Sequence, residues 1–344
     1  MTVLRGPLVL VLILALLAGP VSHAAAATAP LKLPDMPLHD PWIVADKASQ
    51  TYFLYTSNVP AMTGERTIGV MVYESHDLKT WTAPKIVFHL PSDSWANGGG
   101  WAPEVHAWHG KYYMFVTVHN EATPITGVTA KPNRHPYRRG TVLARADTPE
   151  GPFELVNGGE PVTPANLMTL DGTLYVDPAG KPWLVYAHEW LQQTDGTIEA
   201  IPLDDNLKAK GEPVVLFKAS DAPWAKANAQ ATPGDVVYVT DGPELIRTRD
   251  GHLLMLWSSW GNDGYVQSIA RSDTGDLKGP WTQLDPLMRR DSGHGMVFET
   301  FDGQPMLVLH RPFKNARGKL YDVRDAGDHL EILRQRTDLD GDPQ

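Results

Sequence analysis

The feature that most constrains the fold of this chain is a strand–turn–strand unit that recurs five times. In the third copy, residues 171–190, the alternating apolar residues Leu174 and Val176 lead into a turn at residues 177–180 and a second apolar strand. Alternation on both sides of a Pro/Gly turn predicts a β-hairpin. The other copies begin at Asp40, Trp101, Asp241 and His294.

A second motif, a polar turn that in most copies precedes an aromatic residue, follows each unit. Its copies are residues 75–81, 146–153, 204–207, 272–281 and, in a weaker form, 322–325. The units start roughly 50 to 70 residues apart, which is room for four strands and their loops. We therefore predict an all-β fold, a five-bladed β-propeller, with little helix because no segment has a sustained helical period. A β-sandwich followed by a smaller domain is the alternative.

The first residues have the pattern of a signal peptide. Arg5 supplies a positive start, an apolar run follows, and small residues stand near position 26. We expect a signal peptide at residues 1–26 and the propeller at residues 27–344, with a secreted or periplasmic product. An uncleaved membrane anchor is the alternative. The chain has no Cys, so the exported fold depends on core burial and strand pairing rather than on disulfides.

The composition restricts the partners. A formal net charge of −10 argues against nucleic acid or an anionic membrane and suits a neutral substrate. With 42% hydrophobic and only 20% charged residues, the chain can bury a large core. We expect a monomer.

Polar residues stand where the innermost strands begin, and these starts converge on the axis of a propeller. They are Asp40, Glu104, Asp171, Asp241 and His294. Like charges at close range are costly, so the gathering needs a chemical reason. Glycoside hydrolysis supplies one, because it uses one carboxylate as base or nucleophile and a second carboxyl with a raised pKa as proton donor.

In these motifs the chain resembles glycoside hydrolase family 43. The resemblance lies in residues 40–41, 101–105, 171–180, 240–243 and 293–295. It implies a five-bladed propeller and an inverting enzyme that releases arabinofuranose or xylose from plant cell-wall polysaccharide. It also implies that Asp40 is the general base and that Asp171 raises the pKa of the acid and orients it.

The acid position departs from the family pattern. The family has a Glu directly before Gly-Pro, and this chain has Asp241. Asp is one methylene shorter, so its proton lies roughly 1.5 Å further back, and a misplacement of that size costs on the order of a hundredfold in rate. Glu244 is the nearby alternative, but three positions along a strand reverse the facing direction, so we favour Asp241.

Further residues are candidates for sugar or metal contacts. We expect Trp101, Glu104, His188 and Trp260 to contact substrate, with Trp101 the best candidate for an exposed ring; each also has a structural interpretation, as a core aromatic, a turn cap or a buried polar group. His294 resembles the family's axial histidine, which implies a structural calcium ion in the central channel; a buried His bound to backbone is the alternative. No cofactor is expected for the chemistry.

Two functional hypotheses follow. The first is an exported, single-domain, inverting exo-glycosidase acting on arabinofuranosides or xylosides, although the sequence alone does not fix exo or endo action. The second is a catalytically silent carbohydrate-binding propeller, motivated by the short acid at position 241. A retaining propeller hydrolase of the fructan-cleaving or sialidase-like kind lacks support, because the sequence has neither the Glu-Cys pair nor an arginine cluster placed to bind a carboxylate.

Overall fold

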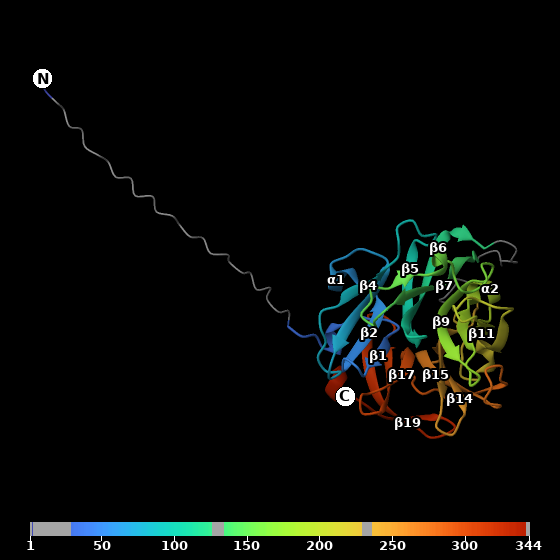
Figure 1. Cartoon of the computed structure of the whole chain (residues 1–344). Coiled ribbons are helices and arrows are strands. Elements are labelled where there is room, and N and C mark those ends of the chain that lie inside the picture. The colour runs from blue at the N-terminus through green and yellow to red at the C-terminus, as the bar shows by residue number, and fades with distance from the viewer. Residues whose placement is uncertain (1, 3–28, 126–133, 229–235, 342–344) are drawn as a thin grey trace.

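The computed structural model describes residues 2, 29–125, 134–228 and 236–341 (Figure 1). The expected signal peptide lies outside this part of the chain except for position 2. The described residues form five four-stranded antiparallel sheets, each built from strands that are consecutive in sequence. The prediction of a five-bladed β-propeller is therefore confirmed.

Each blade runs outward from its innermost strand. Blade 1 contains β1 (Trp42–Asp46), β2 (Thr51–Ser57), β3 (Gly69–Ser75) and β4 (Lys85–His89), and blade 2 contains β5 (Gly98–Trp108), β6 (Lys111–Pro124), β7 (Tyr137–Ala146) and β8 (Glu154–Leu155). Blade 3 contains β9 (Thr169–Val176), β10 (Pro182–His188), β11 (Thr197–Pro202) and β12 (Val214–Lys218). Blade 4 contains β13 (Asp241–Arg247), β14 (Leu253–Gly261), β15 (Gly264–Ser272) and β16 (Trp281–Gln283), and blade 5 contains β17 (Gly293–Glu299), β18 (Pro305–Arg311), β19 (Arg317–Asp325) and β20 (Leu330–Gln335).

Helix is scarce in the described residues, as predicted. The α-helices are single turns, α1 (Pro60–Thr63), α2 (Trp190–Gln193) and α3 (Thr337–Asp340). The 3₁₀ turns are η1 (Leu33–Asp35), η2 (Asn157–Gly159) and η3 (Ala219–Asp221). In this part of the chain, no helix has the length and apolar character needed to cross a membrane.

The ring closes where the first and last blades meet. The innermost strands β1, β5, β9, β13 and β17 contact one another in that order, and β17 returns to β1, so blue and red strands lie together in Figure 1. The segment before β1 reinforces the closure, since the Leu38 N–H donates to the Ala316 carbonyl at 3.2 Å and Arg317 Nε donates to the Pro34 carbonyl at 2.8 Å. The apolar faces of neighbouring blades pack together as the core.

The hairpin turns follow from local sequence. In blade 2, His109 and Gly110 join Trp108 to Lys111 with φ of 48° and 74°, the left-handed pair of a tight two-residue turn. In the same blade, β6 continues to Pro124 and β7 begins at Tyr137. With 14 residues, β6 is the longest strand in the described part of the chain.

One backbone feature recurs at the entrance to every innermost strand. A single residue adopts a left-handed conformation there, with φ between 43° and 55°: Asp40, Ala102, Asp171, Gly242 and His294. In blades 2 to 5 the strand register slips across this position, which is the signature of a β-bulge. We call these five positions the entry residues. Asp241 and Glu104 therefore do not occupy the equivalent positions that the sequence pattern suggested, since Gly242 and Ala102 do.

Candidate active site

The entry residues and their neighbours surround one open cavity of about 360 Å³ at the axis, within the size range of small-ligand sites. Its lining comes from the starts of innermost strands and from the second and third strands of the blades. The lining residues used below are Asp40, Asp171, Asp241, His294, Trp101, Arg139, Glu189 and Tyr265. All three carboxyls expected to be catalytic are thus brought together.

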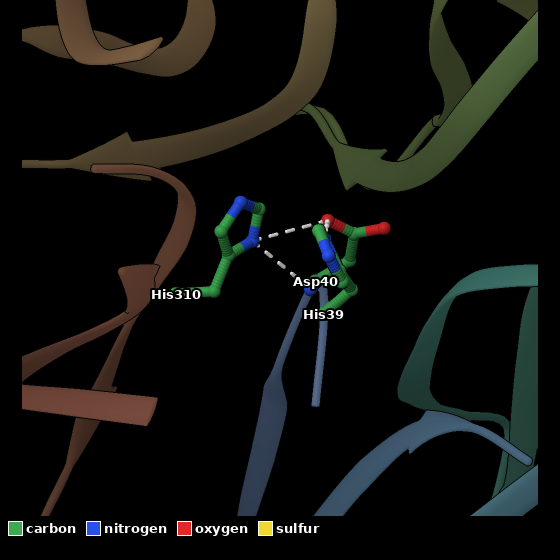
Figure 2. A group of neighbouring side chains, drawn as sticks. All are labelled: His39, Asp40 and His310. Atoms are coloured by element: carbon green, nitrogen blue, oxygen red, sulfur yellow. Dashed lines mark hydrogen bonds and ion pairs between the residues drawn. The ribbon is translucent and has the colours of Figure 1, made fainter. Parts of the chain in front are cut away.

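Asp40 is surrounded by imidazoles. Its backbone N–H donates to Nδ1 of His310 at 3.2 Å, and that nitrogen lies 3.3 Å from its carboxylate. Figure 2 shows His310 and His39 beside Asp40. His294 approaches from the axis, with Nδ1 3.1 Å from the same carboxylate oxygen. Burial alone would raise the pKa of Asp40, but the histidines outweigh it and lower the pKa, so this carboxyl is ionised and suited to act as a base.

Asp171 is the most deeply placed of the three acids, with 4% of the residue exposed. Its Oδ2 accepts a hydrogen bond from the Gly242 N–H at 3.1 Å, and its own N–H donates to the Thr117 hydroxyl at 2.8 Å. Burial and the nearby carboxyls of Asp241 and Asp40 raise its pKa well above the ordinary value, against the opposing effect of His294. This carboxyl therefore couples electrostatically to both of the others.

Asp241 lies at the start of β13 and is anchored by a tyrosine. The Tyr265 hydroxyl donates to its Oδ2 at 2.8 Å. Burial raises the pKa of Asp241 to about 7, helped by the charges of Asp40 and Glu189 and opposed by Tyr265 and Arg139. This carboxyl can hold a proton near neutral pH.

Glu189 is a fourth carboxyl of the cavity that sequence reasoning missed. It directly follows β10, is 2% exposed, and accepts a hydrogen bond on Oε1 from Arg139 Nη1 at 2.6 Å. Burial raises its pKa, and the Arg139 guanidinium opposes the rise. The neighbouring His188 was a candidate from the sequence, but Glu189 follows the end of the second strand β10, whereas the sequence pattern marked the starts of the innermost strands.

Of the aromatic and histidine side chains expected to contact substrate, one lines the cavity and two do not. Trp101 lines the cavity and is 39% exposed, with the Arg139 guanidinium 5.0 Å from its ring centroid. Trp260 packs behind the lining against Tyr265, at a centroid distance of 5.4 Å. His188 is 2% exposed and bonded to Glu199 and Gln192, both at 2.8 Å, which is a structural environment.

Glu104 lies deeper along the axis, where it, Glu244 and His294 line a hollow of about 10 Å³, roughly the space of one water-sized sphere. Burial raises the pKa of Glu104 to about 8 and that of Glu244 well above its ordinary value. A divalent cation would favour the ionised forms, and carboxylate oxygen is the ligand that calcium prefers. The carboxylates beside the expected calcium site thus have the chemistry that calcium binds, but Glu104, Glu244 and His294 do not form a close group of donors among the described residues.

One group of three possible metal donors is close together in the described residues, formed by His39, Asp40 and His310. Nδ1 of His310 lies 3.3 Å from the carboxylate of Asp40, and Nδ1 of His39 lies 4.0 Å from it (Figure 2). We therefore interpret this group as the support of Asp40.

A propeller that gathers one ionised carboxylate and several protonatable carboxyls in an open axial cavity has the parts of a glycoside hydrolase. The chain belongs to glycosyl hydrolases family 43, whose family model matches residues 35–341. The resemblance inferred from the sequence is thereby confirmed.

Individual relatives agree with this assignment. An endo-arabinase from Bacteroides thetaiotaomicron is 34% identical, with a TM-score of 0.75 over 86% of this chain and 98% of that chain. The extracellular endo-α-(1→5)-L-arabinanase 1 of Bacillus subtilis is 27% identical over 164 residues, 44% of this chain and 44% of the relative, so the match spans less than half of that protein. An exo-1,5-α-L-arabinanase from a bovine ruminal metagenomic library shares the fold, with 20% identity and a TM-score of 0.61 over 89% of this chain and 98% of that one.

Proposed function

We propose that the protein is an exported, inverting glycoside hydrolase that cleaves α-1,5-linked arabinan within the chain. The observation that carries the endo mode is a second hollow of about 400 Å³ that adjoins the first. The two hollows share His39, Asp40 and Trp101 in their linings. A polymer would therefore continue on both sides of the proposed base, which is what cleavage inside a chain requires.

The substrate class is supported by the relatives. The protein with 34% identity is an endo-arabinase, and the partial match from Bacillus subtilis is an extracellular endo-arabinanase. Export is supported by the expected signal peptide at residues 1–26 together with that extracellular relative. Arabinofuranosides remain the first substrate class and xylosides the second.

The proposed mechanism uses the two sides of the cavity. Asp40, held ionised by the surrounding imidazoles, removes a proton from a water molecule as that water attacks the anomeric carbon. A carboxylic acid on the opposite side protonates the leaving glycosidic oxygen as its bond to that carbon breaks. The carboxyl of Asp171 interacts electrostatically with those of both Asp40 and Asp241, so the protonation state of each of these three groups affects the other two.

A calcium ion in the axial hollow is part of the proposal. Glu104 and Glu244 would hold it beside His294, and it would supply positive charge beneath the site. The residues named above carry the reaction steps.

The test is hydrolysis of linear α-1,5-arabinan, of an aryl α-L-arabinofuranoside and of xylan. Early products of intermediate length would support endo action, whereas arabinose as the sole early product would establish the exo mode. Proton NMR of the first-formed anomer distinguishes inversion from retention. Binding of arabinan without any product would establish the carbohydrate-binding alternative.

The Asp40→Asn variant tests the base, and we expect a loss of about 10²–10⁴ in kcat. Asp177→Asn is the matched control, because Asp177 stands in the hairpin turn at the opposite end of blade 3. Unchanged turnover in Asp40→Asn would remove Asp40 from the mechanism.

A further inference from the structure

The expected proton donor, Asp241, is one methylene shorter than the glutamate expected at its position. Its side chain is short, and its Oδ2 accepts the hydrogen bond from Tyr265 at 2.8 Å. It also precedes the entry residue Gly242 rather than occupying that position. A general acid needs a proton on an oxygen that can come within hydrogen-bond reach of the leaving oxygen.

Glu189 meets that requirement better. Its Oε1 faces the N–H of Arg139 at 2.6 Å, so the proton belongs on the other oxygen. That oxygen, Oε2, is buried and has no hydrogen-bond partner among the described residues. A buried oxygen without a donor is costly for a carboxylate but not for a hydroxyl that bonds to a substrate.

The Glu189 side chain also has the methylene that the Asp241 side chain lacks. A Glu reaches roughly 1.5 Å further than an Asp, and Glu189 enters the same cavity from the end of β10. The strand β10 is antiparallel to β9, so its end lies at the same edge of blade 3 as Asp171.

We propose that Glu189 is the proton donor of the hydrolysis, an inference that rests on the proposed function. The Oε2–H bond breaks as a new O–H bond forms on the leaving oxygen and the bond from that oxygen to the anomeric carbon breaks. Water adds to that carbon and gives its proton to Asp40. The negative charge left on Glu189 is stabilised by Arg139, which acts as a positioning residue.

The experiment compares two aryl α-L-arabino-oligosaccharides that differ only in their leaving group, phenyl or 2,4-dinitrophenyl. The second leaves without protonation, so loss of the acid harms only the first. For Glu189→Gln we expect kcat/KM to fall about 10²–10⁴-fold on the phenyl substrate and on arabinan, and less than about tenfold on the dinitrophenyl substrate. Asp241→Asn should reduce both aryl activities to a similar degree.

The pH profile gives a second measurement. Activity of the wild type on the phenyl substrate should fall as pH rises through the pKa of the donor, because the donor must be protonated. This fall should be absent in Glu189→Gln with the dinitrophenyl substrate. Glu189→Asp, which keeps the acid and shortens it, should show the same leaving-group dependence and covers the case in which the Gln variant does not fold.

Glu199→Gln is the matched structural control. Glu199 is another buried glutamate of blade 3, bonded to His188 at 2.8 Å and to Tyr186 at 3.0 Å. It should lower stability without any leaving-group dependence. Equal losses of Glu189→Gln on the two aryl substrates, or leaving-group dependence in Asp241→Asn instead, would overturn the inference, whereas a wild type inactive on all of these substrates would overturn the proposed function itself.

Discussion

The ion pair between Arg139 and Glu189 offers a quantitative test of the site, through the variant Arg139→Met. The two side chains are 7% and 2% exposed and lie 2.6 Å apart. Removing one partner of a buried pair costs about 3–5 kcal/mol when the other charge stays uncompensated. Glu189 can avoid this cost by taking up a proton.

The free energy needed to protonate Glu189 sets how the stability loss of Arg139→Met depends on pH. Above the ordinary pKa of 4.5, each pH unit adds about 1.4 kcal/mol to the cost of protonating a carboxyl. We therefore expect a loss of unfolding free energy of about 1 kcal/mol at about pH 5 and about 4 kcal/mol at about pH 8. The sign follows because Arg139 lowers the pKa of Glu189, so its removal raises that pKa further in the folded variant; the variant is then most stable below the unfolded pKa and loses stability as pH rises toward its folded pKa.

The measurement is urea unfolding followed by tryptophan fluorescence at the two pH values. Arg138→Met is the matched control, because the neighbouring Arg138 pairs with Glu160, whose side chain is 60% exposed. That variant should lose less than about 1 kcal/mol, equally at both pH values. An equal loss at both pH values in Arg139→Met, or a larger loss at low pH, would refute the reasoning about Glu189.

Two further predictions concern the sugar-binding wall and the axis. Trp101→Ala should raise KM for arabinan about tenfold, the equivalent of about 1.4 kcal/mol of ring stacking, with kcat nearly unchanged. An unchanged KM in this variant would exclude a stacking role for Trp101. Trp108→Ala, at the opposite end of β5, is the control. Calcium at a hundredfold excess over its Kd should stabilise the fold by about 2.7 kcal/mol, which is measured as a rise in Tm. EDTA should reverse this rise, and the Glu104→Gln variant should not show it. A Tm insensitive to calcium would exclude the axial ion.

The blades could be predicted from the sequence because their signals are local. Hairpin turns such as that at His109 and Gly110 are determined by adjacent residues, and five repeats of the same pattern strengthen the prediction of each blade. The strand-leading acids Asp40, Asp171 and Asp241 were found by the same periodicity, and the cavity brings all three together. What those residues do is a proposal that the experiments above address.

Residues contributed by other strands escaped the sequence analysis for a topological reason. In an antiparallel blade, the end of the second strand and the start of the third return to the edge where the first strand begins. Glu189 follows β10, Arg139 lies near the start of β7 and Tyr265 near the start of β15. No spacing rule links these positions to the strand starts, because the intervening turns differ in length from blade to blade.

The recurring left-handed entry residue separates the chemistry of the cavity from the architecture of the sheets. Since each bulge sets its residue outside the regular hydrogen-bond ladder, strand pairing does not fix the side chain there, although the His294 ring leaves no room for one at Gly242. Aspartate, alanine, glycine and histidine already occupy this one backbone position in different blades of the same molecule. A propeller of this kind can therefore acquire a new substrate by exchanging side chains around its mouth, while the five sheets that carry them stay as they are.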